Sequence, residues 1–151
     1  DLENIENMMK KHNLWNEIKT NAYKALDPII SLLKKTGITP NGLTTIGYFI
    51  TLISSVVLIA GAELGTRGDY RYITWFGAIT LFGGLFDMLD GQLARSTNKM
   101  SKFGALYDST LDRYGEMTMF LGICYYLISN HYFLSSLFAF IAMIGSIMVS
   151  Y

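Results

Sequence analysis

The sequence predicts an all-α fold: an integral membrane helical bundle with four spanning helices, preceded by an amphipathic interfacial helix. Hydrophobic residues make up 51% of the 151 positions and charged residues only 16%. The charges are also unevenly distributed, because four long stretches contain none: residues 41–62, 73–86, 117–129 and 132–151. Uncharged apolar runs of this kind are typical of helices that cross a hydrocarbon core, so a bilayer is the expected solvent.

Residues 1–36 form the first predicted segment. They mix charged side chains with apolar ones that recur at helical spacing, as in Trp15, Ile18, Ala22 and Leu26. This pattern predicts an amphipathic interfacial segment on the membrane surface, and a helical arm packed on the rest of the protein is the alternative. Gly37 and Pro40 then interrupt the pattern, so we expect a separate transmembrane domain over residues 37–151.

Four spans are expected in the second domain, at residues 43–60, 73–94, 103–129 and 132–151. A polar loop, residues 61–72, joins the first two, and a basic loop, residues 95–102, joins the second and third. Nine Lys and Arg residues lie in 1–42 and 95–102, against two in 61–72, so the positive-inside rule places the basic loop in the cytoplasm. The last run reaches the final residue without a polar flank, and we expect further sequence beyond it.

Composition also excludes some functions. The formal net charge is zero, so the chain as a whole gives no electrostatic case for nucleic-acid binding. Cys124, the single cysteine, lies in an apolar run and is interpreted as a packing residue. The two histidines are far apart in sequence, which does not favour a histidine metal site.

Acidic residues cluster where a membrane protein can least tolerate them. Asp87 and Asp90 lie near the end of the second span, and Asp108 and Asp112 lie near the start of the third. Spacings of three and four residues put each pair on one helix face. In a hairpin of two facing antiparallel helices, both pairs would lie at the cytoplasmic end, so the four carboxylates are expected to converge there.

Converging carboxylates repel one another unless protons or a cation hold them together. Oxygen ligands without His or Cys favour magnesium, manganese or calcium over zinc, and four carboxylates suit a pair of such ions. Two divalent ions bridged by carboxylates are typical of phosphoryl transfer. An ion-coupled membrane transporter, in which intramembrane aspartates relay cations, is the alternative function.

Small residues accompany the acidic ones at four-residue steps. Gly83, Asp87, Gly91 and Arg95 share one helix face, on which glycine allows close approach and the guanidinium can pair with phosphate oxygens. Close packing between helices would by itself explain Gly83 and its neighbour Gly84. It does not explain the aspartates.

The residues of this region resemble the signature of the CDP-alcohol phosphotransferases. Asp87-x-x-Asp90-Gly91-x-x-Ala94-Arg95 is followed after eight residues by Gly104-x-x-x-Asp108-x-x-x-Asp112, which matches every defining position of that signature. Pro40 and Asn41 before the first span extend the resemblance over most of the chain. The run from Phe103 to Arg113 is most similar to the branch that makes phosphatidylinositol or its phosphate.

The resemblance implies transfer of a phosphatidyl group from CDP-diacylglycerol, or a related CDP-alcohol, to an alcohol such as inositol or inositol phosphate, with release of CMP. It implies six spans, of which this chain would hold four, and leaves a homodimer open. Two Mg²⁺ ions, or Mn²⁺, would be bound by Asp87, Asp90, Asp108 and Asp112, with Asp112 also the general base. The CDP-lipid contacts would be Asn41, Thr44, Gly91, Ala94, Arg95, Ser101 and Gly104.

Overall fold

The computed structural model describes residues 26–66, 68–98 and 100–149, and within them it contains helices and turns but no strand. The chain divides into two units, residues 1–38 and 39–151. In the first unit, residues 26–36 are helical. Most of the predicted interfacial segment lies outside the described residues, so its amphipathic helix stays a prediction.

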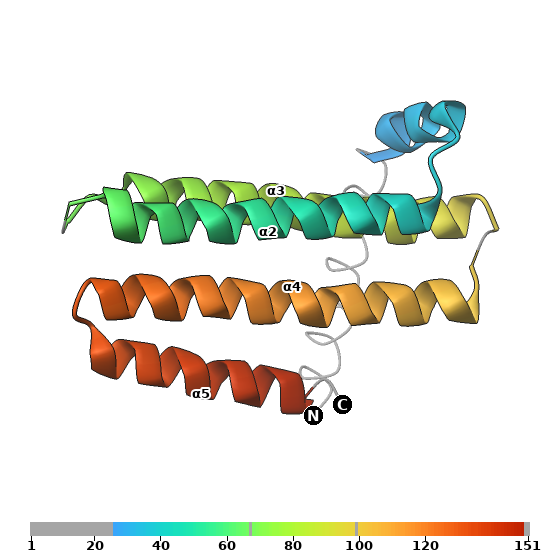
Figure 1. Ribbon diagram of the computed structural model, residues 1–151. Helices are drawn as coiled ribbons and strands as arrows, with labels where there is room; N and C mark the ends of the chain where they lie inside the picture. Colours follow the sequence, from blue (N-terminus) through green and yellow to red (C-terminus); the bar gives the residue numbers. More distant parts are fainter. Residues whose placement is uncertain (1–25, 67, 99, 150–151) are drawn as a thin grey trace, which may run out of the picture. The chain divides into compact units, whose positions relative to one another are not determined.

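The second unit consists of four helices: α2 (Pro40–Leu64), α3 (Arg71–Ser96), α4 (Lys102–Ser129) and α5 (Phe133–Val149) (Figure 1). The helices lie where the sequence predicts them, and the all-α class is confirmed within the described residues. By length and hydropathy, α2 and α3 can each cross a membrane. α5 is apolar but has 17 residues, and the 28-residue α4 carries the acidic cluster near its start.

Short polar side chains determine where two helices begin. The Thr39 hydroxyl accepts a hydrogen bond from the Gly42 amide at 3.1 Å, directly before Pro40 in the first helical position of α2. Ser101 caps α4 in the same way, since its hydroxyl accepts from the Gly104 amide at 2.9 Å. The starts of α2 and α4 and the end of α3 lie at one end of the bundle (Figure 1).

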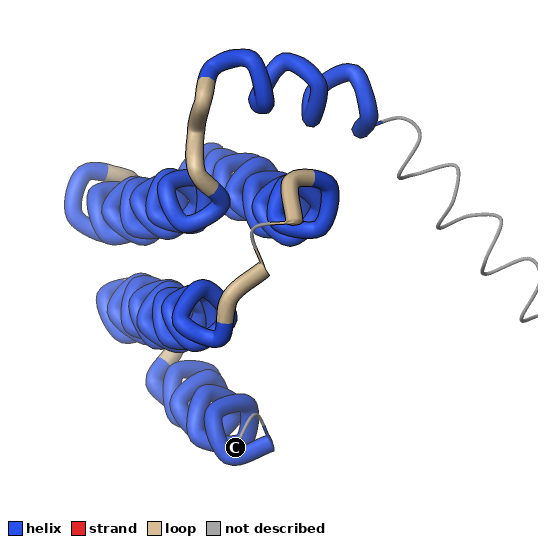
Figure 2. The backbone as a smooth tube through the Cα atoms, turned by 90° about the vertical axis from the view of Figure 1, so that its right-hand side faces the viewer, coloured by secondary structure: helices blue, strands red, loops and turns tan. Residues whose placement is uncertain are grey.

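α2 is the helix on which the others are arranged. It packs along both α3 and α4, whereas α3 and α4 make no close backbone contact with each other, and α5 packs on α4. Figure 2, which looks along the helices, shows α2 and α3 side by side with α4 below them and α5 beyond α4. The two helices of the predicted hairpin, α3 and α4, are antiparallel, but they do not pack directly on each other, because α2 contacts both.

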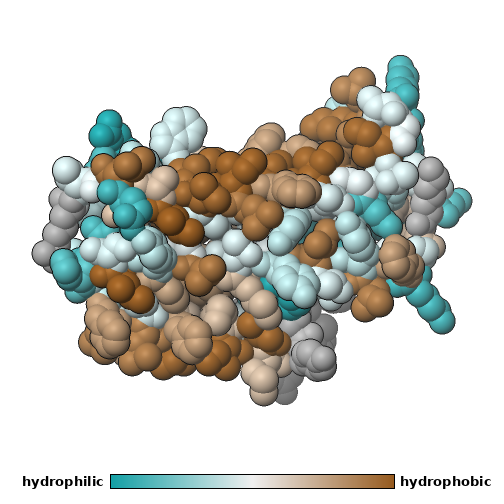
Figure 3. All heavy atoms as spheres, viewed as in Figure 1, coloured by the Kyte–Doolittle hydropathy of each residue, from teal (hydrophilic) through white to brown (hydrophobic). Residues whose placement is uncertain are grey.

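Apolar side chains cover the outside of this bundle. Phe49, Leu81, Leu121 and Phe138 are each more than half exposed, whereas few large side chains are fully buried. Apolar surface extends over the middle of the helices on the face shown in Figure 3, and polar side chains gather at their two ends. A bundle with an apolar exterior and polar ends is suited to a bilayer.

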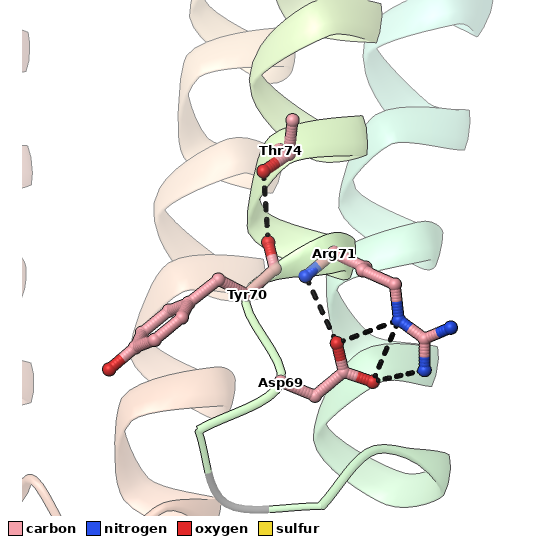
Figure 4. Close-up of polar contacts among 4 residues, drawn as sticks. All are labelled: Asp69, Tyr70, Arg71 and Thr74. Atoms are coloured by element: carbon pink, nitrogen blue, oxygen red, sulfur yellow. Dashed lines mark hydrogen bonds and ion pairs between the residues drawn. The ribbon is translucent and has the colours of Figure 1, made fainter.

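The turn between α2 and α3 lies at the other end of the bundle. Asp69 accepts a hydrogen bond from the Arg71 amide at 3.1 Å, and its carboxylate forms an ion pair with the Arg71 guanidinium at 2.8 Å (Figure 4). These hydrogen bonds hold the pKa of Asp69 below its ordinary value. The Thr74 hydroxyl donates to the Tyr70 carbonyl at 3.0 Å in the first turn of α3.

Candidate metal centre

Three of the four predicted metal ligands form one group. Carboxylate oxygens of Asp87, Asp90 and Asp108 lie within 4.8 Å of one another. Asp87 and Asp90 come from the last three turns of α3 and Asp108 from the second turn of α4, so the group forms across the space between two helices that do not themselves pack together. Asp90 is the most buried of them, at 3% exposure.

Two cavities adjoin this group. The first, which we call the Asp112 cavity, has a volume of about 300 Å³ and includes Asp87 and Asp112 in its wall. The second, the Asp108 cavity, has a volume of about 180 Å³ and includes Asp90 and Asp108. The four aspartates are thus divided in pairs between two neighbouring spaces, with one residue of each pair on α3 and one on α4.

All seven residues that the resemblance assigns to the CDP-lipid line the Asp108 cavity: Asn41, Thr44, Gly91, Ala94, Arg95, Ser101 and Gly104. They come from the start of α2, the end of α3 and the start of α4. A Cβ added at Gly91 would lie 3.7 Å from Arg95 Nη2, so the guanidinium extends across the glycine. The cavity therefore combines helix starts, a cation and two carboxylates, a chemistry that suits a phosphate ester together with a metal ion.

Asp112 is not in the group of three. It lines the Asp112 cavity together with Asp87. The remaining wall of this cavity is rich in hydroxyl groups that the sequence did not single out, from Tyr48, Thr51 and Thr80. Nothing in their local sequence distinguishes them from ordinary polar residues in a helix, because only packing shows that they share a cavity.

Glu116 is a further acidic residue of the Asp112 cavity. It accepts a hydrogen bond from Arg113 Nη1 at 3.1 Å and another from the Ser146 hydroxyl, which connects α4 to α5. The sequence alone assigned Glu116 no role. Its spacing of four residues from Asp112 is the signal that puts it on the same helix face.

The two adjacent glycines of α3 differ in their surroundings. A Cβ at Gly83 would lie 3.3 Å from Thr51 Oγ1, and one at Gly47 would lie 3.3 Å from Phe86 Cβ, so α2 and α3 approach closely there. Packing explains Gly83, as predicted. Gly84 has open space around it and lines the Asp112 cavity, so the packing interpretation was wrong for this residue.

The carboxylate group fits a divalent cation. Within the described residues, Asp108 Oδ1 is buried and has no hydrogen-bond partner, which is costly for a carboxylate oxygen unless a cation or a proton satisfies it. Three ionised carboxylates within 4.8 Å also repel one another, and a bound cation relieves this repulsion. An all-oxygen donor set is the one that Mg²⁺ and Mn²⁺ prefer.

Fold and site together define a class: an all-helical protein with membrane-length apolar helices and a cluster of carboxylates at one end. Residues 37–151 match the family of CDP-alcohol phosphatidyltransferases. The chain belongs to this family.

Two curated relatives are similar to most of this chain. An archaetidylinositol phosphate synthase of Pyrococcus horikoshii is 36% identical over 142 residues, which are 91% of this chain and 65% of the relative. A phosphatidylinositol phosphate synthase of Mycobacteroides abscessus is 30% identical over 103 residues, which are 68% of this chain and 43% of the relative. The chain thus spans less than two thirds of the length of these relatives.

Solved structures agree with the fold. The phosphatidylinositol phosphate synthase of Mycobacterium tuberculosis with CDP-DAG bound has a TM-score of 0.64 and 28% identity, over 82% of this chain and 58% of that one. The same enzyme in complex with manganese and citrate has a TM-score of 0.65 and 26% identity, over 82% of this chain and 56% of that one.

Proposed function

We propose that this protein transfers a phosphatidyl group, or its archaeal counterpart, from a CDP-linked lipid to an alcohol and releases CMP. The observation that carries the proposal is the position of the carboxylate group between two cavities. One cavity is lined by all seven predicted CDP-lipid contacts, and the other is lined by hydroxyl groups and two acids. Family membership favours this function over the ion-coupled transporter.

The donor would bind in the Asp108 cavity. Arg95 is the cationic side chain in its wall, and a guanidinium can pair with diphosphate oxygens through two parallel hydrogen bonds. Gly91 and Gly104 have no side chains and so leave room in this cavity. A Cβ at Gly104 would lie 3.0 Å from Ser101 Oγ and 3.2 Å from Asn41 Oδ1. CDP-diacylglycerol, which is bound in the similar Mycobacterium tuberculosis enzyme, is the donor class that this cavity supports.

Asp87, Asp90, Asp108 and Asp112 would hold the divalent ions, two Mg²⁺ ions in our proposal, with Mn²⁺ as a substitute. When bound, such ions withdraw charge from the phosphate oxygens and from the leaving CMP. The manganese complex of the similar mycobacterial enzyme supports this assignment. The unsatisfied Asp108 oxygen and the close approach of three carboxylates support it independently.

The acceptor alcohol would enter the Asp112 cavity. Asp112 would remove the proton from the acceptor hydroxyl, whose oxygen then forms a bond to the lipid-linked phosphorus while the bond from that phosphorus to the CMP oxygen breaks. The surrounding hydroxyl groups can hydrogen-bond a polyol. Inositol or inositol phosphate is the acceptor that the names of the relatives favour.

Four spans of the present chain would cross the membrane in the full protein, with the metal centre on the cytoplasmic side. The basic residues at that end of the helices support this orientation. A homodimer is compatible with the apolar exterior of the bundle.

CMP release tests the function. The full-length protein in lipid vesicles would be given labelled CDP-diacylglycerol or its archaeal analogue, together with inositol, inositol phosphate or glycerol phosphate. We expect CMP release that requires both Mg²⁺ and one acceptor. No release with any acceptor, in protein that still binds the CDP-lipid, would contradict the proposal.

Substitution of the proposed base tests the mechanism. Asp112→Asn should lower turnover by about 100-fold or more, the range typical of a lost general base, while CDP-lipid binding changes little. Near-normal turnover in this variant would exclude the base role.

A further inference from the structure

The contact between Thr44 and Asp90 is the most buried hydrogen bond of the site. Thr44, in the second turn of α2, is 6% exposed, and its hydroxyl lies 2.5 Å from Asp90 Oδ2 on α3. Asp90 itself is 3% exposed. The sequence resemblance assigns Thr44 to the CDP-lipid, but its hydroxyl is directed at a carboxylate.

Thr44 donates its single hydroxyl proton in a hydrogen bond to Asp90. Thr44 Oγ1 also lies 3.2 Å from the Pro40 carbonyl oxygen, so there are two candidate acceptors. A hydroxyl can donate only once, and a charged acceptor at about 2.5–2.7 Å forms the stronger bond. Thr44 thus donates to Asp90 and has only lone pairs left for other partners.

This bond restricts the direction of the Asp90 carboxylate. A donor held on Oδ2 by a different helix limits rotation of the carboxylate plane, which also determines where Oδ1 points. Asp90 shares the group of three with Asp87 and Asp108, so its orientation affects how the group can bind a cation. Thr44 also lies in the wall of both cavities, at the place where they adjoin.

We propose that Thr44 is a positioning residue for the metal centre: its hydroxyl orients Asp90, and α2 thereby takes part in metal binding although it contributes no ligand. The inference rests on the proposed function for the identity of the centre. It predicts that loss of the hydroxyl weakens cation binding by about tenfold or more, the loss typical when a metal ligand loses its hydrogen-bond partner.

Three variants of the full-length protein test it. Thr44→Val removes the hydroxyl and keeps the shape, whereas Thr44→Ser keeps the hydroxyl. Thr45→Val is the matched control, because Thr45 joins α2 to α4 through a 2.9 Å hydrogen bond to Tyr107 Oη and lines neither cavity. Mn²⁺ affinity would be measured without substrate by the electron paramagnetic resonance signal of free Mn²⁺, and KM for the CDP-lipid separately.

We expect weaker Mn²⁺ binding in Thr44→Val, wild-type affinity in Thr44→Ser and Thr45→Val, and a matching increase in the Mg²⁺ concentration that half-activates turnover. If Thr44→Val does not fold, Thr44→Ala replaces it in the same series. Unchanged Mn²⁺ affinity with a raised KM for the CDP-lipid would overturn the proposal in favour of a direct substrate contact. Equal loss of affinity in Thr45→Val would overturn it in favour of a general packing effect. Neither result depends on wild-type CMP release, which tests the function itself.

Discussion

Replacing Asp108 with asparagine should stabilise the protein without metal and abolish its stabilisation by metal. At an effective dielectric constant of 20, two ionised carboxylates 4.8 Å apart repel by about 3.5 kcal/mol. Asp108 takes part in two of the three pairs, so at this separation and dielectric constant its charge accounts for about 7 kcal/mol of repulsion. Protons, water and counterions relieve most of this. A fifth of it, about 1.4 kcal/mol, would raise the melting temperature of a chain of this size by about 3–6 °C.

The assay is thermal unfolding of the full-length protein in detergent, followed by tryptophan fluorescence. In EDTA, Asp108→Asn should melt above the wild type. With Mn²⁺ at 100 times its dissociation constant, the wild type should gain about 2.7 kcal/mol, which corresponds to about 5–11 °C. The variant should gain little, because an amide is a poor substitute for a buried carboxylate ligand.

Asp69→Asn is the control for removal of a carboxylate, because Asp69 lies in the turn at the other end of the bundle and is paired with Arg71. It should show no gain in EDTA and a wild-type response to Mn²⁺. If Asp108→Asn melted no higher than the wild type in EDTA, or kept the full Mn²⁺ response, Asp108 would have no part in carboxylate repulsion or metal binding.

Two glycine substitutions distinguish an effect on the CDP-lipid site from an effect on helix packing. Gly104→Ala places a methyl group 3.0 Å from Ser101 Oγ in the Asp108 cavity. KM for the CDP-lipid should therefore rise by about tenfold while Mn²⁺ affinity is unchanged. An unchanged KM would exclude Gly104 from the donor site. Gly61→Ala places a methyl group directly against Tyr72 Cβ where α2 meets the start of α3. It should cost about 1–3 kcal/mol of stability without changing KM, whereas Gly77→Ala, which has open space, should not destabilise the protein. Equal melting temperatures for these two variants would contradict the packing argument.

The helices and the acidic cluster could be predicted from the sequence because both depend on local spacing. Long uncharged runs are costly anywhere but in apolar surroundings, so α2 to α5 lie where the runs are. The spacings of Asp87, Asp90 and Asp108 place them near the ends of two helices joined by a short loop, and three of the four predicted ligands do come together. Ser101 had a structural role that its position after a loop could have suggested, since serine is a preferred residue before a helix.

The sequence by itself determined which residues reach this end of the bundle, because helix length and residue spacing follow from the chain alone. Only the tertiary structure decided how they are divided: Asp90 and Asp108 in one cavity, Asp87 and Asp112 in the other, and Thr44 directed at Asp90. The physical reason is the packing of α2, which contacts both α3 and α4 while these two stay apart. The contact partners of a helix depend on side-chain packing between segments far apart in sequence, and no spacing within one segment specifies them.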